Sequence, residues 1–143
     1  MSIARSDQEL KQEFVKTTMK CTETNPVGVS EVMSLQNLVV PTNMETKCLL
    51  ACTYKKLGTM NAKGLYDLDK AMAIADQETS DDPARYENSK KLVNICVKVN
   101  DEKVSDGEKG CERAALMFKC LLENAPKHVA GCRQPNSYSQ LPV

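Results

Sequence analysis

Cysteine is the residue type with the greatest capacity for chemistry in this chain, because seven cysteines occur in 143 residues. Thiols bind metals, act as nucleophiles or form disulfides. Six of them predict a disulfide framework: Cys21, Cys48, Cys52, Cys96, Cys111 and Cys120. Since the chain has no C-x-x-C pair and only one histidine, this pattern argues against a metal site and favours an oxidising compartment.

The seventh cysteine, Cys132, lies four residues after the only histidine, His128. On a helix this spacing would bring a thiolate and an imidazole together, as a nucleophilic enzyme requires. Gly131 and Pro126 disfavour that helix, and no third group is placed to orient the imidazole. We therefore expect no enzyme activity and no catalytic residues, and we interpret Cys132 as a free thiol or an intermolecular disulfide.

The composition excludes several other classes of function. The 19 basic and 19 acidic residues are interspersed and give a net charge of zero, which disfavours nucleic-acid binding. No stretch approaches the ~20 apolar residues of a spanning helix, so we expect no membrane insertion. The first residues lack an apolar signal segment, and we expect a secreted protein whose signal peptide is absent from this chain.

Helical periodicity and capping motifs recur along the chain, whereas strand patterns do not. They predict helices over residues 6–21, 30–35, 42–57, 67–76, 83–100 and 108–124. The last of these is apolar all round and should be central. We expect a single domain over residues 1–143, with a core of about 6–124 and an irregular tail of 125–143.

The predicted helices restrict how the cysteines pair. Cys48 and Cys52 share one helix face at ~5–6 Å, whereas the Cβ atoms of a disulfide are ~3.8 Å apart. Cys111 and Cys120 fall on opposite sides of one helix and must reach different partners. These two exclusions leave ten of the fifteen pairings of six cysteines open.

The intervals of 26, 3, 43, 14 and 8 residues between successive cysteines resemble the six-cysteine pattern of insect odorant-binding proteins, the pheromone and general odorant-binding protein family. The resemblance covers residues 6 to 122. It implies an all-α fold, a compact bundle of about six helices cross-linked by three interlocked disulfides around an internal apolar cavity. The implied disulfides are Cys21–Cys52, Cys48–Cys111 and Cys96–Cys120. The interval of 43 residues is long for the family, so residues 56–82 should differ from relatives.

The resemblance also implies a function. We expect a secreted carrier that binds a small hydrophobic ligand, a volatile odorant or pheromone, in extracellular sensillar fluid, without a cofactor and as a monomer or homodimer. An olfactory receptor would be a further partner. The alternative is a carrier of the same fold for hormone-like or other lipophilic compounds, which tissue location would distinguish. A purely structural or protein-interaction role would be indicated if no fluorescent apolar probe bound and the core had no cavity of roughly a few hundred Å³.

Apolar residues on faces away from the cysteines are the candidates for the cavity wall, with ordinary core packing as the alternative for each of them. They are Phe14, Met33, Leu38, Leu57, Met60, Leu68, Met72, Ala75, Val93, Val97, Ala115, Phe118 and Leu122. Candidate polar anchors for a ligand oxygen are the hydroxyls of Tyr54, Tyr66, Ser89 and Tyr138.

The tail offers two further hypotheses. Similar proteins have tails that enter the pocket or lie across it, and the prolines favour the second arrangement here, with Tyr138, Leu141 and Val143 as contacts; disorder is the alternative. His128 is a candidate pH switch, because its unperturbed pKa is the one side-chain value between pH 5 and 8. If it acts, binding should weaken toward pH 5.

Overall fold

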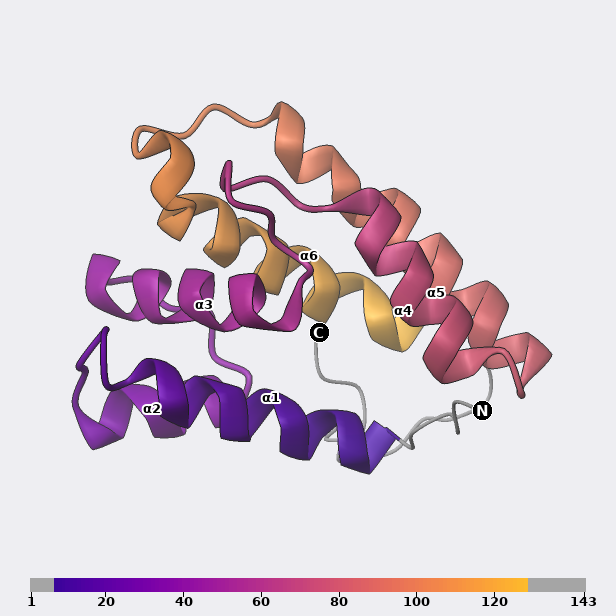
Figure 1. The fold of residues 1–143 in the computed structure, drawn as a ribbon, viewed down its shortest axis with the longest axis horizontal. Helices are drawn as coiled ribbons and strands as arrows, with labels where there is room; N and C mark the ends of the chain where they lie inside the picture. The colour runs from indigo at the N-terminus through magenta and orange to yellow at the C-terminus, as the bar shows by residue number, and fades with distance from the viewer. Residues whose placement is uncertain (1–6, 129–143) are drawn as a thin grey trace.

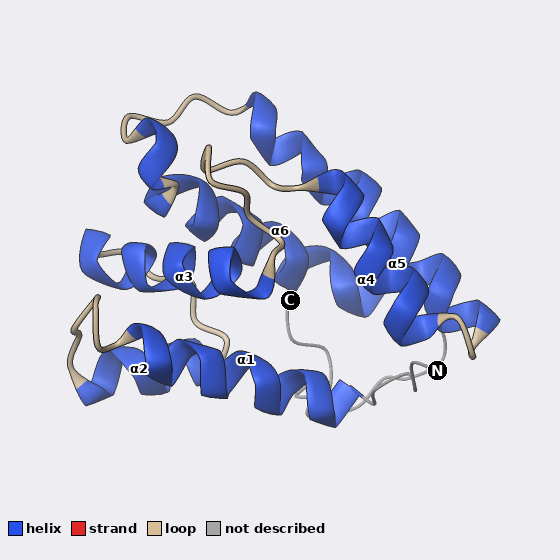
Figure 2. Ribbon diagram, viewed as in Figure 1, coloured by secondary structure: helices blue, strands red, loops and turns tan. Residues whose placement is uncertain are grey.

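A computed structural model of the chain describes the backbone of residues 7–128 and the side chains of residues 8–125. Its regular elements are all helical (Figure 2), and this confirms the predicted all-α fold of about six helices. The elements are α1 (Asp7–Cys21), α2 (Val29–Gln36), α3 (Met44–Leu57), α4 (Leu68–Thr79), α5 (Pro83–Cys96), the 3-10 helices η1 (Val97–Asp101) and η2 (Gly107–Lys109), and α6 (Cys111–His128).

Short polar side chains set the N-termini of the inner helices. The Asn43 side chain accepts a hydrogen bond from the Thr46 amide at 2.8 Å, so α3 begins at Met44, after the predicted start at residue 42. Asp67 caps α4 and Asp82 caps α5 in the same way. The left-handed Gly58, with φ of 92°, ends α3 as predicted.

Two predicted helix ends are wrong. The helix expected over 83–100 ends as an α-helix at Cys96 and tightens into η1, whose carbonyls bond outside the helix. The tail expected from residue 125 begins later, because α6 continues to His128. Pro126 lacks one backbone donor, and one missing bond in the last turns does not end a helix that is already held by its packing.

The helices pack in a series that positions the site. α3 lies between α1 and α6, α6 also packs on α5, α5 packs on α4, and α2 packs on α1. In Figure 1, α6 runs behind the others, with α1 and α3 on one side and the α4–α5 pair on the other. Within the described part of the chain, no helix has both the length and the apolar composition needed to cross a bilayer.

Three disulfides join successive members of this series. Cys21–Cys52 links α1 to α3, Cys48–Cys111 links α3 to the start of α6, and Cys96–Cys120 links α5 to α6. These are the three pairings that the family resemblance implies. They hold the inner faces of four helices toward one another, and α2 and α4 carry no disulfide.

Candidate ligand-binding site

An aromatic cluster, defined as Phe14, Tyr54 and Phe118, occupies the interior where α1, α3 and α6 meet. The Phe14 ring lies 6.1 Å from the Tyr54 ring and 6.5 Å from the Phe118 ring, measured between centroids. All three side chains are at most 2% exposed. Each ring comes from a different helix, so the cluster depends on the packing that the disulfides enforce. Aromatic pairs at these distances add to the energy of simple burial.

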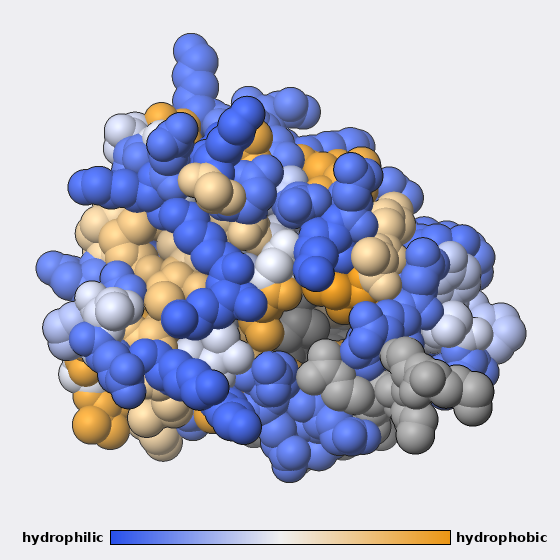
Figure 3. Space-filling view, in the orientation of Figure 1, coloured by the Kyte–Doolittle hydropathy of each residue, from blue (hydrophilic) through white to orange (hydrophobic). Residues whose placement is uncertain are grey.

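Further apolar side chains pack around the aromatic cluster, and we name them the apolar wall. Met60 and Val93 are buried, and half-buried apolar side chains complete the set: Leu38, Leu57, Met72 and Leu122. The wall therefore draws on the loops after α2 and α3 and on helices α3 to α6. Figure 3 shows apolar atoms gathered near the middle of one face, where α3, α4 and α6 come together in Figure 1.

The aromatic cluster and the wall contain nine of the predicted ligand-contact residues, and the candidate anchor Tyr66 belongs to the same core cluster. Ala75 and Ala115 are buried but lie apart from it, and Ser89 and Val97 are half-buried outside it. Met33 is 50% exposed at the surface.

Leu68 is likewise exposed, to 38%. The remaining candidates cannot be placed. Tyr138, Leu141, Val143 and Cys132 lie outside the described residues, as does the side chain of His128.

Two phenols give the apolar interior its polar character. Tyr54 is completely buried, and Tyr66 is 3% exposed. Burial raises the pKa of Tyr66 well above its ordinary value of 10.0. Burial, followed by the neighbouring Tyr66 phenol, raises the pKa of Tyr54. Both side chains are therefore neutral hydrogen-bonding groups at any physiological pH, as a site for an uncharged ligand requires.

Asn100 and Arg113 fix the loops beside the site, and the sequence patterns did not indicate either residue. Asn100 pairs with both backbone groups of Tyr66, at 2.8 and 3.0 Å. Arg113 is only 6% exposed and donates hydrogen bonds to the carbonyls of Val99 and Glu102. An arginine within the apolar helix α6 was the one signal available, because a buried charge needs dedicated partners.

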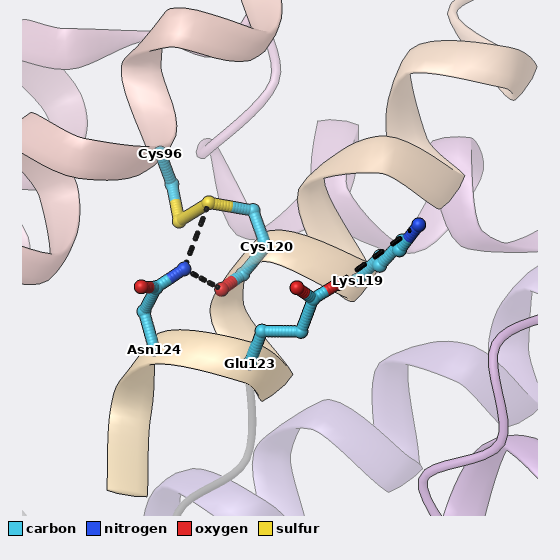
Figure 4. Close-up of polar contacts among 5 residues, drawn as sticks. All are labelled: Cys96, Lys119, Cys120, Glu123 and Asn124. Atoms are coloured by element: carbon cyan, nitrogen blue, oxygen red, sulfur yellow. Dashed lines mark hydrogen bonds and ion pairs between the residues drawn. A yellow bond between two sulfur atoms is a disulfide. The ribbon is translucent and has the colours of Figure 1, made fainter. Parts of the chain in front are cut away.

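Polar side chains in the C-terminal half of α6 surround the Cys96–Cys120 disulfide (Figure 4). The Asn124 side-chain amide donates to the Cys120 carbonyl oxygen at 2.8 Å and lies 3.5 Å from the Cys120 sulfur. Lys119 and Glu123 are 4.0 Å apart on the solvent side. Such exposed pairs contribute little energy, so the disulfide and the apolar contacts hold α5 against α6.

The described part of the chain gives little support for a second ligand pocket or a metal site. A surface depression of about 220 Å³ lies between the α1–α2 loop and the start of α3, away from the apolar wall. Its lining is Asn25, Pro26, Met44, Glu45 and Cys48. Among the described residues, no group of three His, Cys, Asp or Glu side chains is gathered as a metal ion would need.

The chain is similar in sequence to general odorant-binding proteins of Drosophila melanogaster. General odorant-binding protein 28a is 32% identical over 82 residues, which are 57% of this chain and 54% of that protein. General odorant-binding protein 19d is 30% identical over 104 residues, 68% of this chain and 62% of that protein. The matched segments thus span between about half and two thirds of the length of these relatives.

The solved structure of odorant-binding protein 28a from the same species has the same fold, with a TM-score of 0.66 at 21% identity. The match covers 85% of this chain and 97% of that chain. A model of the PBP/GOBP family matches residues 4–124, which include all six cysteines of the framework. With the helical fold and three disulfides described above, this match shows that the chain belongs to the PBP/GOBP family of odorant-binding proteins.

Proposed function

We propose that this protein is a secreted carrier that binds a small hydrophobic molecule, a volatile odorant or pheromone, in extracellular fluid and performs no chemistry on it. One observation carries the proposal. The aromatic cluster and the apolar wall draw apolar side chains from helices far apart in sequence into one interior region, inside a shell closed by three disulfides. Membership of the PBP/GOBP family supports the same conclusion.

The disulfides give this arrangement a physical purpose. A chain of 143 residues can bury a sufficient core without cross-links. A ligand cavity, however, destabilises a core by about 24 cal/mol per Å³ of unfilled volume. Each disulfide stabilises a fold by roughly 2–4 kcal/mol, so the three together offset a void of about 250–500 Å³, which is large enough for a small ligand. Cross-links beyond the needs of folding are therefore consistent with a carrier.

A fluorescent apolar probe tests the proposal. We expect N-phenyl-1-naphthylamine to bind the oxidised protein saturably at neutral pH and to be displaced by volatile ketones or alcohols. The assay should use Cys132→Ser beside the wild type, so that thiol chemistry outside the framework does not affect the result. Probe binding that does not saturate, or that no volatile compound reverses, would contradict the carrier function.

Two half-buried leucines on α6 provide a matched pair of variants. Leu122 belongs to the apolar wall and was a predicted ligand contact, whereas Leu116 packs against the core from another position on the helix. Leu122→Phe should fill ligand space and weaken probe binding severalfold, because added volume in a packed interior is poorly accommodated. Leu116→Phe should leave the affinity unchanged at a similar cost in stability. Equal affinity of the two variants would place the probe elsewhere.

A further inference from the structure

The three disulfides share one pattern of exposure, because each joins a half-buried cysteine to a buried one. The half-buried members are Cys48, Cys52 and Cys120, and their buried partners are Cys111, Cys21 and Cys96. Thiol–disulfide exchange begins when a thiolate attacks one sulfur, and the other sulfur leaves with the bonding electrons. A charged thiolate is costly to bring into an apolar core, so attack must come at the half-buried member. The buried cysteine is then the leaving group.

The three leaving groups differ in their positions on the helices. Cys21 is the last residue of α1 and Cys96 is the last residue of α5, whereas Cys111 is the first residue of α6. The helix dipole stabilises a thiolate at the start of a helix and destabilises one at its end. A leaving group that is more stable as a thiolate departs faster. Of the three bridges, Cys48–Cys111 therefore has the most favourable leaving group.

Two charged side chains near Cys111 act in opposite directions. The Asp106 carboxylate accepts a hydrogen bond from the Cys111 N–H at 2.8 Å, and its negative charge opposes a thiolate there. Lys55 favours the thiolate, because its ammonium group and the Cys111 sulfur contact the same carbonyl oxygen, that of Lys109, at 3.1 and 3.9 Å. The lysine charge offsets the aspartate charge, so the helix dipole still distinguishes Cys111 from the other two leaving groups.

The sulfur that a reagent must attack borders an open part of the surface. Cys48 lines the depression of about 220 Å³ between the α1–α2 loop and the start of α3. A water molecule occupies about 30 Å³ of liquid, so this volume admits a small organic thiol. Glu45 is the one charged residue in the lining, where Asn25, Pro26 and Met44 are uncharged. Its carboxylate repels anionic thiols and favours uncharged or cationic ones.

We propose that Cys48–Cys111 is a thiol-exchange site, at which a small uncharged or cationic thiol opens the framework while the other two bridges remain closed. The thiolate of the reagent attacks the Cys48 sulfur and forms a mixed disulfide. The Cys48–Cys111 bond breaks, and its electron pair leaves on Cys111, which takes a proton from water. A second thiol attacks the mixed disulfide, frees Cys48 as a thiol and departs as the disulfide of the reagent.

The protein thus gains two electrons, and the two reagent molecules lose them. Opening of this bridge removes the covalent link between α3 and the start of α6 and leaves those of α1 to α3 and of α5 to α6 in place. We therefore expect the reduced protein to remain folded, with an unfolding midpoint in urea below that of the oxidised protein. This inference goes beyond the carrier function and does not depend on which ligand is bound.

The test measures how fast each bridge opens in the Cys132→Ser protein, in which the seventh cysteine cannot compete with the reagent. The oxidised protein is treated with 2-mercaptoethanol at neutral pH, quenched in acid, trapped with N-ethylmaleimide and mapped by mass spectrometry. We expect Cys48–Cys111 to open about fivefold faster than either other bridge, with the reagent attached to Cys48. In concentrated urea the three rates should become similar, because the helices that distinguish the leaving groups are unfolded.

Two lysines on α3 provide matched variants. Lys55→Gln should slow the opening of Cys48–Cys111 about twofold, because it removes a positive charge near the leaving sulfur. Lys56 is exposed one residue further along the helix, and Lys56→Gln should leave the rate unchanged. Glu45→Gln should speed the reaction with anionic 2-mercaptoethanesulfonate about twofold and leave the reaction with 2-mercaptoethanol unchanged. A change in local structure would instead alter the rates of both reagents together.

The outcomes decide the proposal without reference to ligand binding. Faster opening of Cys21–Cys52 or Cys96–Cys120, or equal rates for all three bridges in the folded protein, would overturn it. A mixed disulfide found on Cys111 instead of Cys48 would also overturn it, because the roles of the attacked and leaving sulfurs would then be reversed. None of these results bears on the carrier function, which the apolar probe tests separately.

Discussion

Helices α1, α3 and α6 are held together in a different way from the α4–α5 hairpin. Two disulfides and the aromatic cluster join the first three helices, which we call the cross-linked half. The hairpin has no disulfide between its own helices, although they pack on each other, and the buried apolar residues of α4 are the small Ala71 and Ala75. Polar contacts supplement these, including the Tyr86–Asp76 hydrogen bond.

The difference indicates separate tasks for the two regions. Large interlocking side chains and cross-links make a stiff surface, whereas alanine contacts and exposed polar pairs resist displacement weakly. A ligand enters an enclosed site only if part of the wall moves. We therefore expect the hairpin, tied to α6 by Cys96–Cys120 alone among the disulfides, to be the compliant wall, and the cross-linked half to be the fixed one.

Removal of the disulfides should give the largest effects and the clearest contrast. Cys48 and Cys111 are 63 residues apart in sequence, and Cys96 and Cys120 are 24 apart. The chain-entropy model gives a loss of roughly 4 kcal/mol for the Cys48→Ser/Cys111→Ser pair and roughly 3.5 kcal/mol for the Cys96→Ser/Cys120→Ser pair. Urea unfolding measures both losses.

Ligand affinity should follow the opposite order, because Cys96–Cys120 holds the compliant wall in place. We expect the Cys96→Ser/Cys120→Ser variant to lose more probe affinity than the Cys48→Ser/Cys111→Ser variant, under conditions where both are folded by circular dichroism. A larger affinity loss in the Cys48→Ser/Cys111→Ser variant would reverse the assignment of the two walls.

Gly64 should have the next largest effect, since it lies in the segment that leads into α4. Its φ is +76°, and an added Cβ would lie 2.8 Å from the Gly107 carbonyl oxygen and 3.0 Å from that of Glu108. Gly64→Ala should therefore cost more than about 2 kcal/mol, from the left-handed backbone and the displaced loop together.

Gly107 provides the control for that substitution. Its φ is +54°, but an added Cβ would have no atom within 4 Å. Gly107→Ala should cost only the left-handed penalty of about 1–2 kcal/mol. Equal losses of unfolding free energy in the two variants would show that the close contact between the Gly64 loop and the Gly107 loop does not stabilise the start of α4.

The tyrosines should give a smaller, pH-dependent effect. Burial raises the pKa of Tyr54 and Tyr66 in the folded state, so the folded protein retains more protons than the unfolded chain above pH 10.0. Their contribution to stability is complete below that pH and is lost as the pH rises through the folded-state pKa. Urea unfolding at increasing pH should therefore show falling stability, with a shallower fall in Tyr66→Phe.

Tyr86 distinguishes the hairpin from the cross-linked half in the same experiment. The hydrogen bond to Asp76 raises the pKa of Tyr86, but this ring lies at the surface. Its phenolate absorbance should appear while the helical circular dichroism is intact, whereas those of Tyr54 and Tyr66 should appear with unfolding. Ionisation of the buried phenols in a fully helical protein would contradict their placement. A Cys132→Ser background prevents disulfide exchange by that thiol at high pH.

The helices were predictable from the sequence because their apolar periods and caps are local properties. The exact ends of the helices were less predictable. Thr42 and Asn43 are both plausible N-caps of α3, and the structure uses Asn43, whose side-chain amide also donates to Glu31. The end of α5 depends on Arg113 of α6, which donates hydrogen bonds to the Val99 and Asn100 carbonyls of η1. Hydrogen bonds between residues this far apart in sequence produce no periodic pattern from which they could be predicted.

The candidate site was predictable to a similar degree. Helical periodicity identified Phe14 and Phe118 as inward-facing, and the structure brings both rings together. It could not show which apolar faces another element covers, and so it did not separate Met72 in the apolar wall from Met33 at the surface. Whether an apolar helix face is covered depends on how the helices pack against one another, and the periodicity of the sequence does not determine that packing.

The methionines allow the most direct test of the central claim that the ligand occupies the apolar interior. Met60 and Met72 belong to the apolar wall. Met19, Met33 and Met44 are 44 to 50% exposed at the surface. In protein labelled with ¹³C at the methionine methyl groups, an aromatic probe should shift the NMR signals of Met60 and Met72 saturably and leave those of the three surface methionines in place. Shifts confined to Met19, Met33 and Met44, or no shift at a probe concentration that saturates fluorescence, would contradict the account.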